Sequence, residues 1–396
     1  MSFSTLILIG VVALLGPLLA LPTRWRIPVV IGELIGGVVI GASGFGLVKT
    51  SDPTFSFLAN LGFGLTMFVA GSNVPLRDAR LRPSLLRGLV RAVGVGIVAA
   101  ILAVIVATVF HTGHAAMYGV LMASSSAVLV LPAVNDLGLG GPKVLPMIAQ
   151  VAIADTVSIV ALPLVIDPAR TASAAIGAGI IAAAAVLLYL ILRWLRVSGR
   201  LHRFHKFSER RHFALELRIS LILLFALAAV ATDSHISIML AGFALGLVLA
   251  GVAEPRRLAS QLFALTDGFL GPLFFVWLGA SLSIGALFAH PQFVLLGVAL
   301  GVGAILAHLA MRIFRQPVPL ALMSASQLGV PIAAATIGQQ TNILVPGESA
   351  ALILGGLITI VGLAIGARVA GRTQVDTAAP AKDAPSEPSP PKTASA

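Results

Sequence analysis

Apolar runs close to twenty residues in length recur along almost the whole chain, and short polar or basic segments separate them. A helical run of about twenty apolar residues is long enough to cross the ~30 Å hydrocarbon core of a bilayer. Charged residues form only 10% of the 396 residues, whereas a soluble domain carries about 25%. The sequence therefore predicts an all-α polytopic membrane protein.

The apolar runs predict thirteen transmembrane spans. They lie near residues 3–21, 27–48, 54–73, 88–110, 114–134, 144–166, 172–195, 213–232, 235–252, 262–284, 286–311, 318–338 and 349–370. The first is interpreted as an uncleaved helix, because no basic residue precedes it and Arg24 and Arg26 follow it. The segment 373–396 is rich in Ala, Pro and Ser, which predicts a disordered tail with no soluble domain attached.

The basic residues support this number of spans. With thirteen spans, only Lys49 and Arg170 fall on the side of the N-terminus, and the other 24 of the 26 Lys and Arg residues fall on the opposite side. Cytoplasmic loops carry the excess of Lys and Arg, so we expect a cell-membrane protein with its N-terminus outside and its C-terminus cytoplasmic. This bias also accounts for the net charge of +11, and no nucleic-acid partner is expected.

Several classes of function are excluded. The chain has no cysteine, so disulfides and thiolate chemistry are absent. It has no Walker A sequence and no metal-binding cluster of histidines. Neither enzymatic activity nor ATP-driven transport nor a cofactor is therefore expected.

Two regions of the chain are similar to one another. A shift of 209 positions matches Gly37 to Gly246, and a shift of 208 matches Gly71 to Gly279. The matched spans are seven apart, an odd number, so the two copies must insert in opposite orientations, as in many secondary transporters. The predicted organisation is a first repeat over 1–171, a linker helix with a basic cytoplasmic loop over 172–212, a second repeat over 213–372 and the tail over 373–396.

Two corresponding spans place small polar residues before a proline. The fifth contains Ser124, Ser125 and Ser126, and the twelfth contains Gln327 in a similar cluster before Pro331. Proline removes a backbone donor and small polar side chains can satisfy the freed groups, so both helices are predicted to unwind near the middle of the membrane. The converging helix ends could then bind a cation. Alternatively, the serines bond within intact helices that the prolines only kink.

Only two of the fifteen acidic residues lie within predicted spans, and Asp155 is the deeper of them. A charge at the bilayer centre costs about 2.5–3.5 kcal/mol, so it marks a functional site. Because burial disfavours the bare anion, the carboxylate is predicted to hold either a monovalent cation or a proton, with Thr156 and Ser158 as further oxygen ligands. The structural alternative is a protonated Asp155 that only hydrogen-bonds a neighbouring helix.

Two other ionisable residues are auxiliary candidates. Glu33 lies roughly 10 Å along the second span from Arg26, at about 1.5 Å per residue, and could instead support packing among its neighbouring glycines. His308 lies one turn from Arg312, so we expect an interfacial histidine with satisfied hydrogen bonds.

These motifs resemble those of the monovalent cation:proton antiporter-2 family, of the Kef and Nap type. The resemblance covers about residues 5–370 and is most specific over 28–46, 61–71 and 273–282 and in the Asp155 helix. It implies a sodium/proton antiporter-like fold with an inverted-topology repeat and two crossed discontinuous helices. It also implies a homodimer with a dimerisation domain, a mobile core and elevator-like alternating access.

The chain departs from the family pattern near the site. Ala154 precedes Asp155 where family members carry Asp, Asn or Gln, and Val330 follows Gly329 where Kef-type chains carry a glutamate. The eleventh span lacks the basic residue that many members have at its middle. These departures concern the transported ion and the stoichiometry rather than the fold.

The sequence therefore predicts an antiporter that exchanges Na⁺ or K⁺ for protons across the bilayer and serves pH homeostasis. Asp155 is expected to be the single shared carrier, which predicts electroneutral exchange. Two alternatives stay open. One is a sodium-coupled organic-anion transporter on the related fold, and the other is a channel-like K⁺ efflux protein.

Overall fold

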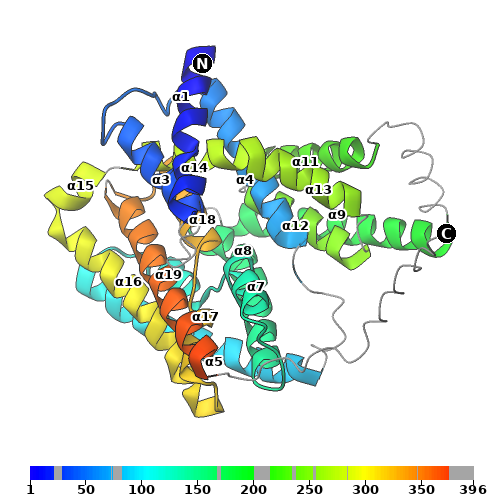
Figure 1. Cartoon of the computed structure of the whole chain (residues 1–396), viewed down its shortest axis with the longest axis vertical. Helices are drawn as coiled ribbons and strands as arrows, with labels where there is room; N and C mark the ends of the chain where they lie inside the picture. Colours follow the sequence, from blue (N-terminus) through cyan, green and yellow to red (C-terminus); the bar gives the residue numbers. More distant parts are fainter. Residues whose placement is uncertain are drawn as a thin grey trace, which may run out of the picture.

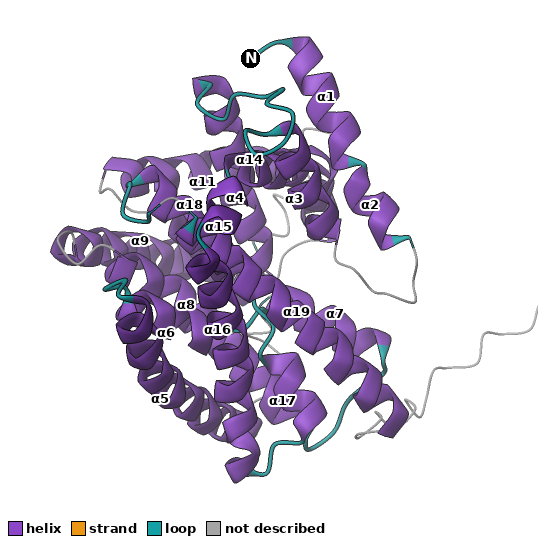
Figure 2. Ribbon diagram, turned by 90° about the vertical axis from the view of Figure 1, so that its left-hand side faces the viewer, coloured by secondary structure: helices purple, strands orange, loops and turns teal. Residues whose placement is uncertain are grey.

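The computed structural model describes residues 1–21, 29–72, 74, 83–166, 171–199, 215–233, 238–252, 256–282, 284–345 and 347–373. The regular secondary structure in these ranges is entirely helical (Figure 2). The first half contains α1 (Phe3–Ala13), α2 (Leu15–Ala20), α3 (Val29–Ile40), α4 (Pro53–Ser72), α5 (Leu85–Phe110), α6 (Ala115–Ala123), α7 (Ala127–Asp136), α8 (Val144–Ile166) and α9 (Thr171–Val197). The second half contains α11 (Leu215–Asp233), α12 (Ile238–Val252), α13 (Arg256–Leu265), the π-helix η3 (Thr266–Leu270), α14 (Gly271–Ser281), α15 (Ile284–Ala289), α16 (Pro291–Leu309), the 3₁₀-helix η4 (Ala310–Phe314), α17 (Val318–Ser324), α18 (Gly329–Gln340) and α19 (Glu348–Thr373).

The helices correspond in order to the thirteen predicted spans. Eleven helical segments in the described residues are long and apolar enough to cross a membrane, and α3 and α12 are two shorter apolar helices. The expected all-α polytopic fold is thus confirmed. Arg24, Arg26, most of the basic loop and the predicted tail lie outside the described residues.

Helices α3, α4, α12 and α14 pack against one another through glycines, and we call them the glycine-packed bundle. Gly37 of α3 lies against Gly279 of α14, where a methyl group on either residue would overlap the backbone of the other helix. Gly71 of α4 lies in the same way against Gly246 of α12. Small residues allow helix backbones to approach closely without intervening side chains, so these four helices form one closely packed unit.

The two glycine contacts are reciprocal. The sequence matches Gly37 to Gly246 and Gly71 to Gly279, and in space Gly37 contacts Gly279 while Gly71 contacts Gly246. A pseudo-two-fold axis between inverted copies would produce this exchange of partners. The repeat and its boundaries remain predictions, which superposition of the two halves would test.

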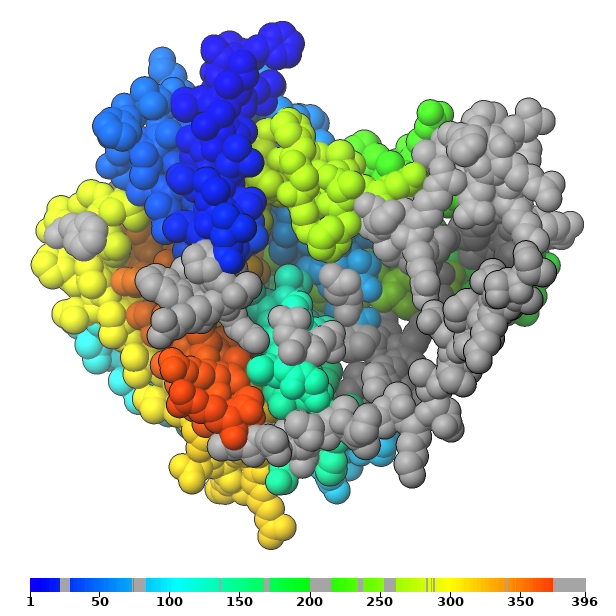
Figure 3. All heavy atoms as spheres, in the orientation of Figure 1, coloured from blue at the N-terminus to red at the C-terminus, as the bar shows by residue number. Residues whose placement is uncertain are grey.

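A second group of helices surrounds the two discontinuous ones, and we call it the broken-helix bundle. It consists of α5, α8, α16 and α19 packed around α6, α7, α17 and α18. Figure 1 shows α5, α16, α17 and α19 at the lower left and α9, α11, α12 and α13 at the right. In Figure 3 the teal surface of α7 adjoins the red end of α19, with which it is in contact. Helix α9 contacts both α8 and α12 and therefore joins the two bundles.

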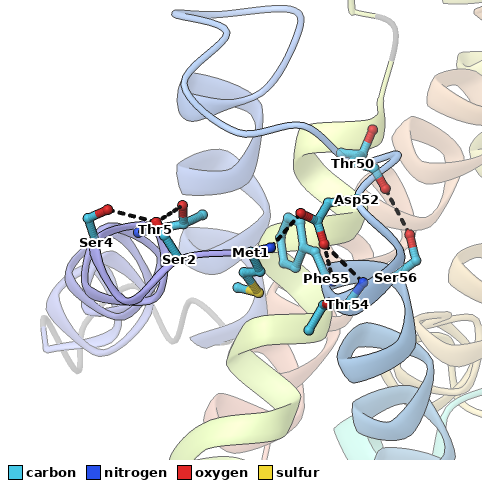
Figure 4. A network of polar contacts seen from close by, with 9 residues as sticks. All are labelled: Met1, Ser2, Ser4, Thr5, Thr50, Asp52, Thr54, Phe55 and Ser56. Atoms are coloured by element: carbon cyan, nitrogen blue, oxygen red, sulfur yellow. Dashed lines mark hydrogen bonds and ion pairs between the residues drawn. The ribbon is translucent and has the colours of Figure 1, made fainter.

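Asp52 fixes the beginning of α4 (Figure 4). Its Oδ1 accepts hydrogen bonds from the backbone N–H groups of Thr54 and Phe55, at 2.9 and 3.1 Å. Its Oδ2 lies 2.7 Å from the amino group of Met1. These contacts stabilise the ionised form, so the pKa of Asp52 is lowered, chiefly by the bond to the amino terminus. Asp52 thereby joins the start of α1 to the start of α4.

Candidate ion-binding site

The predicted break in the fifth span is present, between α6 and α7. Residues Ser124, Ser125 and Ser126 leave the helical conformation, and α7 begins at Ala127. Ser124 adopts an extended conformation, and its Oγ and its backbone N–H both donate to the carbonyl oxygen of Leu121, at 2.8 and 3.0 Å. The alternative of serines within an intact, kinked helix is therefore wrong for this span.

The predicted break in the twelfth span is also present, between α17 and α18. Helix α17 ends at Ser324, and α18 begins at Gly329. The backbone N–H of Gln327 donates to Thr359 Oγ1 of α19 at 3.0 Å. The prolines do not mark the two breaks themselves. Pro132 lies inside α7, and Pro331 lies in the first turn of α18.

The two breaks contact one another through Ser125. Its Oγ donates to the carbonyl oxygen of Ser324 at 2.6 Å. The Nε2 atom of His308 lies 3.3 Å from the Ser125 Oγ atom. Ser125 is 2% exposed and both of its partners are fully buried. The crossing is therefore closed by protein, and Ser125 is the residue that joins its two halves.

The contacts of His308 constrain its protons. Its Nδ1 lies 2.9 Å from the carbonyl oxygen of Ala304, so Nδ1 donates. The single proton of the Ser125 hydroxyl is given to Ser324, and His308 Nε2 must then also donate to make the third contact. A neutral His308 can satisfy only two of these three hydrogen bonds. His308 is thus enclosed by protein and contacts the crossing, and its position at the membrane interface remains a prediction.

Asp155 faces the first break from α8. Its Oδ2 accepts a hydrogen bond of 3.0 Å from the backbone N–H of Ala127, the first residue of α7, and the side chain is buried at 5% exposure. The N-terminus of a helix carries a partial positive charge and stabilises an anion. A carboxylate has about four acceptor positions and this bond uses one, which leaves the others available to an ion. Asp155 therefore combines burial, a favourable helix end and free coordination capacity.

The other predicted ligands lie in different environments. Thr156 is half-buried, and its hydroxyl donates back to Ala152 within α8 at 2.8 Å. Ser158 and Ser126 are buried, at 5% and 4% exposure. The Gln327 side chain is also buried, and its Nε2 atom has no hydrogen-bond partner among the described residues. An unpaired buried donor requires an explanation such as bound water or a ligand.

Glu33 is separated from this crossing. It is buried at 3% exposure on α3, and its Cγ atom lies where Gly16 of α2 leaves space for it. A methyl group on Gly16 would come within 2.8 Å of that atom. The structure therefore places Glu33 in the contact between α2 and α3, as the packing alternative expected.

Two features of the structure were missed from the sequence. Thr359 caps the second break and carries no signal in the sequence, because a neutral threonine in an apolar span is unremarkable. Glu348 is fully buried although it stands at the edge of the last span. Its Oε1 accepts from Tyr118 at 2.7 Å and lies 2.6 Å from His114 Nδ1, so a distant segment supplies its partners. An acid–histidine pair more than 200 positions apart could be found only with co-variation data.

Comparisons with known proteins agree with this architecture. The family described as "Sodium/hydrogen exchanger, transmembrane" matches residues 10–371. The candidate Na⁺/H⁺ antiporter YjbQ of Bacillus subtilis (strain 168) is 26% identical over 382 aligned positions, and the alignment covers 90% of this chain and 61% of YjbQ. The glutathione-regulated potassium-efflux system protein KefC of Enterobacter sp. (strain 638) is 26% identical over 72% of this chain and 46% of its own length. The chain thus spans roughly half to three fifths of these relatives.

The fold is shared with solved structures over nearly the whole chain. The sodium proton antiporter MjNhaP1 from Methanocaldococcus jannaschii, determined at pH 8, superposes with a TM-score of 0.65 at 18% identity. The match covers 95% of this chain and 98% of MjNhaP1. The likeness confirms the expected antiporter-like fold, and the relatives named KefC agree with the expected kinship to Kef-type proteins.

Proposed function

The chain belongs to the transmembrane sodium/hydrogen exchanger family, and from this premise we propose that it is an antiporter that exchanges Na⁺ or K⁺ for protons. The observation that carries the proposal is the bond between Asp155 Oδ2 and the Ala127 N–H. It holds a buried carboxylate at the positive end of a half-helix, beside the crossing of the two broken helices. This is the arrangement that a small cation and a proton can share.

Competition between the two ions follows from burial. A bare carboxylate away from water is costly, so Asp155 is stable when it holds a proton or a cation and unstable when it holds neither. Oxygen ligands suit a hard monovalent cation, and the hydroxyl of Ser158, one turn along α8, is buried with Asp155. The unpaired Ser326 Oγ and Gln327 Nε2 atoms give the second break polar atoms that can orient water at the crossing.

Movement of the broken-helix bundle against the glycine-packed bundle would carry the site across the membrane. Backbone contacts through Gly37, Gly279, Gly71 and Gly246 support a rigid frame. Helix α9, which contacts both bundles, would be the flexible connection. In this proposal the frame holds the homodimer together and the broken-helix bundle moves as an elevator.

Exchange in this account is electroneutral, with one cation for each proton, because a single carboxylate carries the same net charge in both loaded states. His308 is the group that could change this, since it lies in the crossing, and its two hydrogen bonds and the Ser125–Ser324 bond can all form only if the ring carries two protons. Electroneutrality therefore requires His308 to keep one protonation state throughout the cycle. Each net charge moved would couple to the membrane potential by about 2.3 kcal/mol per 100 mV.

The test is ion flux in proteoliposomes with an internal pH dye. A gradient of Na⁺ or K⁺ should drive saturable proton movement, with equal rates at zero and −100 mV and no substrate-induced current on a solid-supported membrane. The potential is clamped with an ionophore that does not carry the tested cation. Uncoupled K⁺ current would instead establish the channel-like alternative, and sodium-dependent uptake of an organic anion without proton movement would establish the other.

The proposed orientation can be tested because the chain contains no cysteine. A single cysteine at Ser2 should react in intact cells with a maleimide that cannot cross the membrane, and one at Ser198 should react only after lysis. Both positions are exposed. The reverse pattern would contradict an N-terminus outside the cell.

A further inference from the structure

A large groove lies between α9 and α12, away from the candidate ion site. Its volume is about 1110 Å³, slightly above the ~300–1,000 Å³ of typical small-molecule pockets. The α9 wall includes Ile181 and Ala185, the α12 wall includes Phe243 and Leu247, and Val160 of α8 closes one side. Asp155 does not line it.

The polar groups of the groove are concentrated at one end. Its walls are otherwise apolar, and the exceptions are Tyr189, Arg193 and Arg196 in the last two turns or so of α9. Arg196 Nη1 donates to the carbonyl oxygen of Val252 at 2.6 Å, which fixes its guanidinium beside the end of α12. Arg193 is exposed, and its guanidinium has no hydrogen bond to any residue in the described ranges.

The charge and the walls exclude a hydrated cation as the occupant. Two guanidinium groups at the mouth repel a cation, and apolar walls cannot replace its water. They suit a molecule with a long hydrocarbon part and an anionic head. Arginine is well matched to phosphate, because its planar fork can donate two parallel hydrogen bonds.

The groove is long enough to hold an acyl chain. Along α12 it runs from Leu240 to Val252, about 18 Å at 1.5 Å per residue. Along α9 it runs from Ala178 to Val197, about 28 Å at the same rise, so the groove is longer than half of a hydrocarbon core of about 30 Å. An acyl chain entering at the arginine end would therefore reach the bilayer midplane.

We propose that this groove binds an anionic phospholipid of the cytoplasmic leaflet, with its phosphate on Arg193 and Arg196 and one acyl chain between α9 and α12. The end that carries the arginines is the cytoplasmic end in the expected topology, where anionic lipids attract basic residues. The lipid would touch Val160, which lies one and a half turns from Asp155 on α8. This site is independent of the proposed exchange activity.

The test is thermal unfolding of the purified protein in detergent during titration with lipid. A ligand that binds only the folded state raises the melting temperature. Phosphatidylglycerol should raise it saturably, whereas phosphatidylcholine and inorganic phosphate should not. Arg193→Gln should increase the half-saturating concentration of phosphatidylglycerol about fivefold, as expected for one basic residue near an anionic surface.

Arg218→Gln is the matched control. Arg218 is an exposed arginine in the first turn of α11, at the expected cytoplasmic end of that helix, and it does not line the groove. It should titrate like the parent. Ala244→Trp fills the groove without removing charge and should abolish the shift while leaving the melting temperature without lipid close to the parental value. Equal stabilisation by both lipids, an unchanged titration in Arg193→Gln or an equal loss in Arg218→Gln would each overturn the proposal.

Discussion

The two broken helices are interrupted in the same way, but the groups that face them differ. At the first break the N–H of Ala127 donates to a carboxylate, Asp155 on α8, and at the second the N–H of Gln327 donates to a neutral hydroxyl, Thr359 on α19. Both bonds are 3.0 Å long, and each acceptor stands on the helix that follows its broken helix along the chain. The geometry is shared, whereas the charge is present at one break only.

The two acceptors can have the same role in the fold, but they differ in what they can contribute to the proposed transport. Either acceptor satisfies an N–H that the interruption leaves free. Only Asp155 can also exchange a proton for a cation, because a threonine hydroxyl does not ionise in the physiological range. We therefore propose that ion exchange takes place at the first break and that the second break has a supporting structural role.

The largest expected effect comes from Asp155→Asn. The amide oxygen can still accept from the Ala127 N–H, so the protein should fold, but the group that titrates is lost. Cation-driven proton flux in proteoliposomes should fall to the background of empty liposomes. Glu33→Gln is the control, because Glu33 is a buried carboxyl group in the contact of α2 and α3 and should be dispensable for exchange. Parental flux in Asp155→Asn would remove Asp155 as the carrier.

Ser125→Ala tests the contact between the breaks. It deprives the Ser324 carbonyl and the His308 ring of a buried partner, so unfolding free energy should fall by about 2–3 kcal/mol. The apparent KM for the cation should rise as well, as it should for Ser125→Leu or Ser126→Leu. Ser124→Ala is the control, since the Leu121 carbonyl that it bonds also accepts from the Ser124 backbone N–H. Equal effects of the two alanine variants would show that the crossing does not depend on Ser125.

Thr359→Val should affect stability and leave exchange nearly intact. The change keeps the shape of the side chain and leaves the buried N–H of Gln327 without its acceptor, at a cost of about 1–2 kcal/mol. Thr336→Val is the matched control, because that hydroxyl only donates back within α18. Denaturation and flux should be measured on both. Loss of exchange in Thr359→Val with normal stability would break the proposed division between the two breaks.

The smallest expected effect is on the pH dependence of stability, through His114 at the beginning of α6. The pKa of His114 is raised above its ordinary value of about 6.5. The largest cause is the hydrogen bond to Glu348. Partial burial acts in the opposite direction, and the charge of Glu348 adds to the increase. The stabilisation from this pair is therefore complete below about pH 6.5 and is lost as the pH rises through the folded-state pKa. The melting temperature should fall over that window in the parent and not in His114→Gln. His111→Asn, at the neighbouring end of α5, should retain the parental slope, and a flat parental profile would contradict the assignment.

The sequence predicted the breaks because small polar residues before a proline, within an apolar run, weaken the helical hydrogen bonding, although both prolines lie inside the half-helices that follow the breaks. It also predicted that Asp155 is exceptional, because a carboxylate far from both membrane surfaces is costly. The particular bond from Asp155 to the Ala127 N–H could not be predicted, since it depends on how α8 packs against α7. The roles of Thr156 and Ser158 as ligands remain predictions.

The burial of His308 and Glu348 shows where such reasoning fails. Distance along a helix from Arg312 estimates depth in the membrane but does not tell which face of α16 meets the crossing. Likewise, the position of Glu348 at the edge of a span does not show that His114 and Tyr118 enclose it. In both cases partners from distant segments decide the environment of an ionisable group.

The most direct test of the central claim is the number of protons released when a cation binds. Purified protein in a weakly buffered solution with a pH indicator is titrated with Na⁺ or K⁺ over a series of starting pH values. If Asp155 is the shared carrier, release approaches one proton per bound cation at the acidic end of the working range, and Asp155→Asn releases none. Cation binding that releases no proton from the parent at any pH, or undiminished release from Asp155→Asn, would contradict the account.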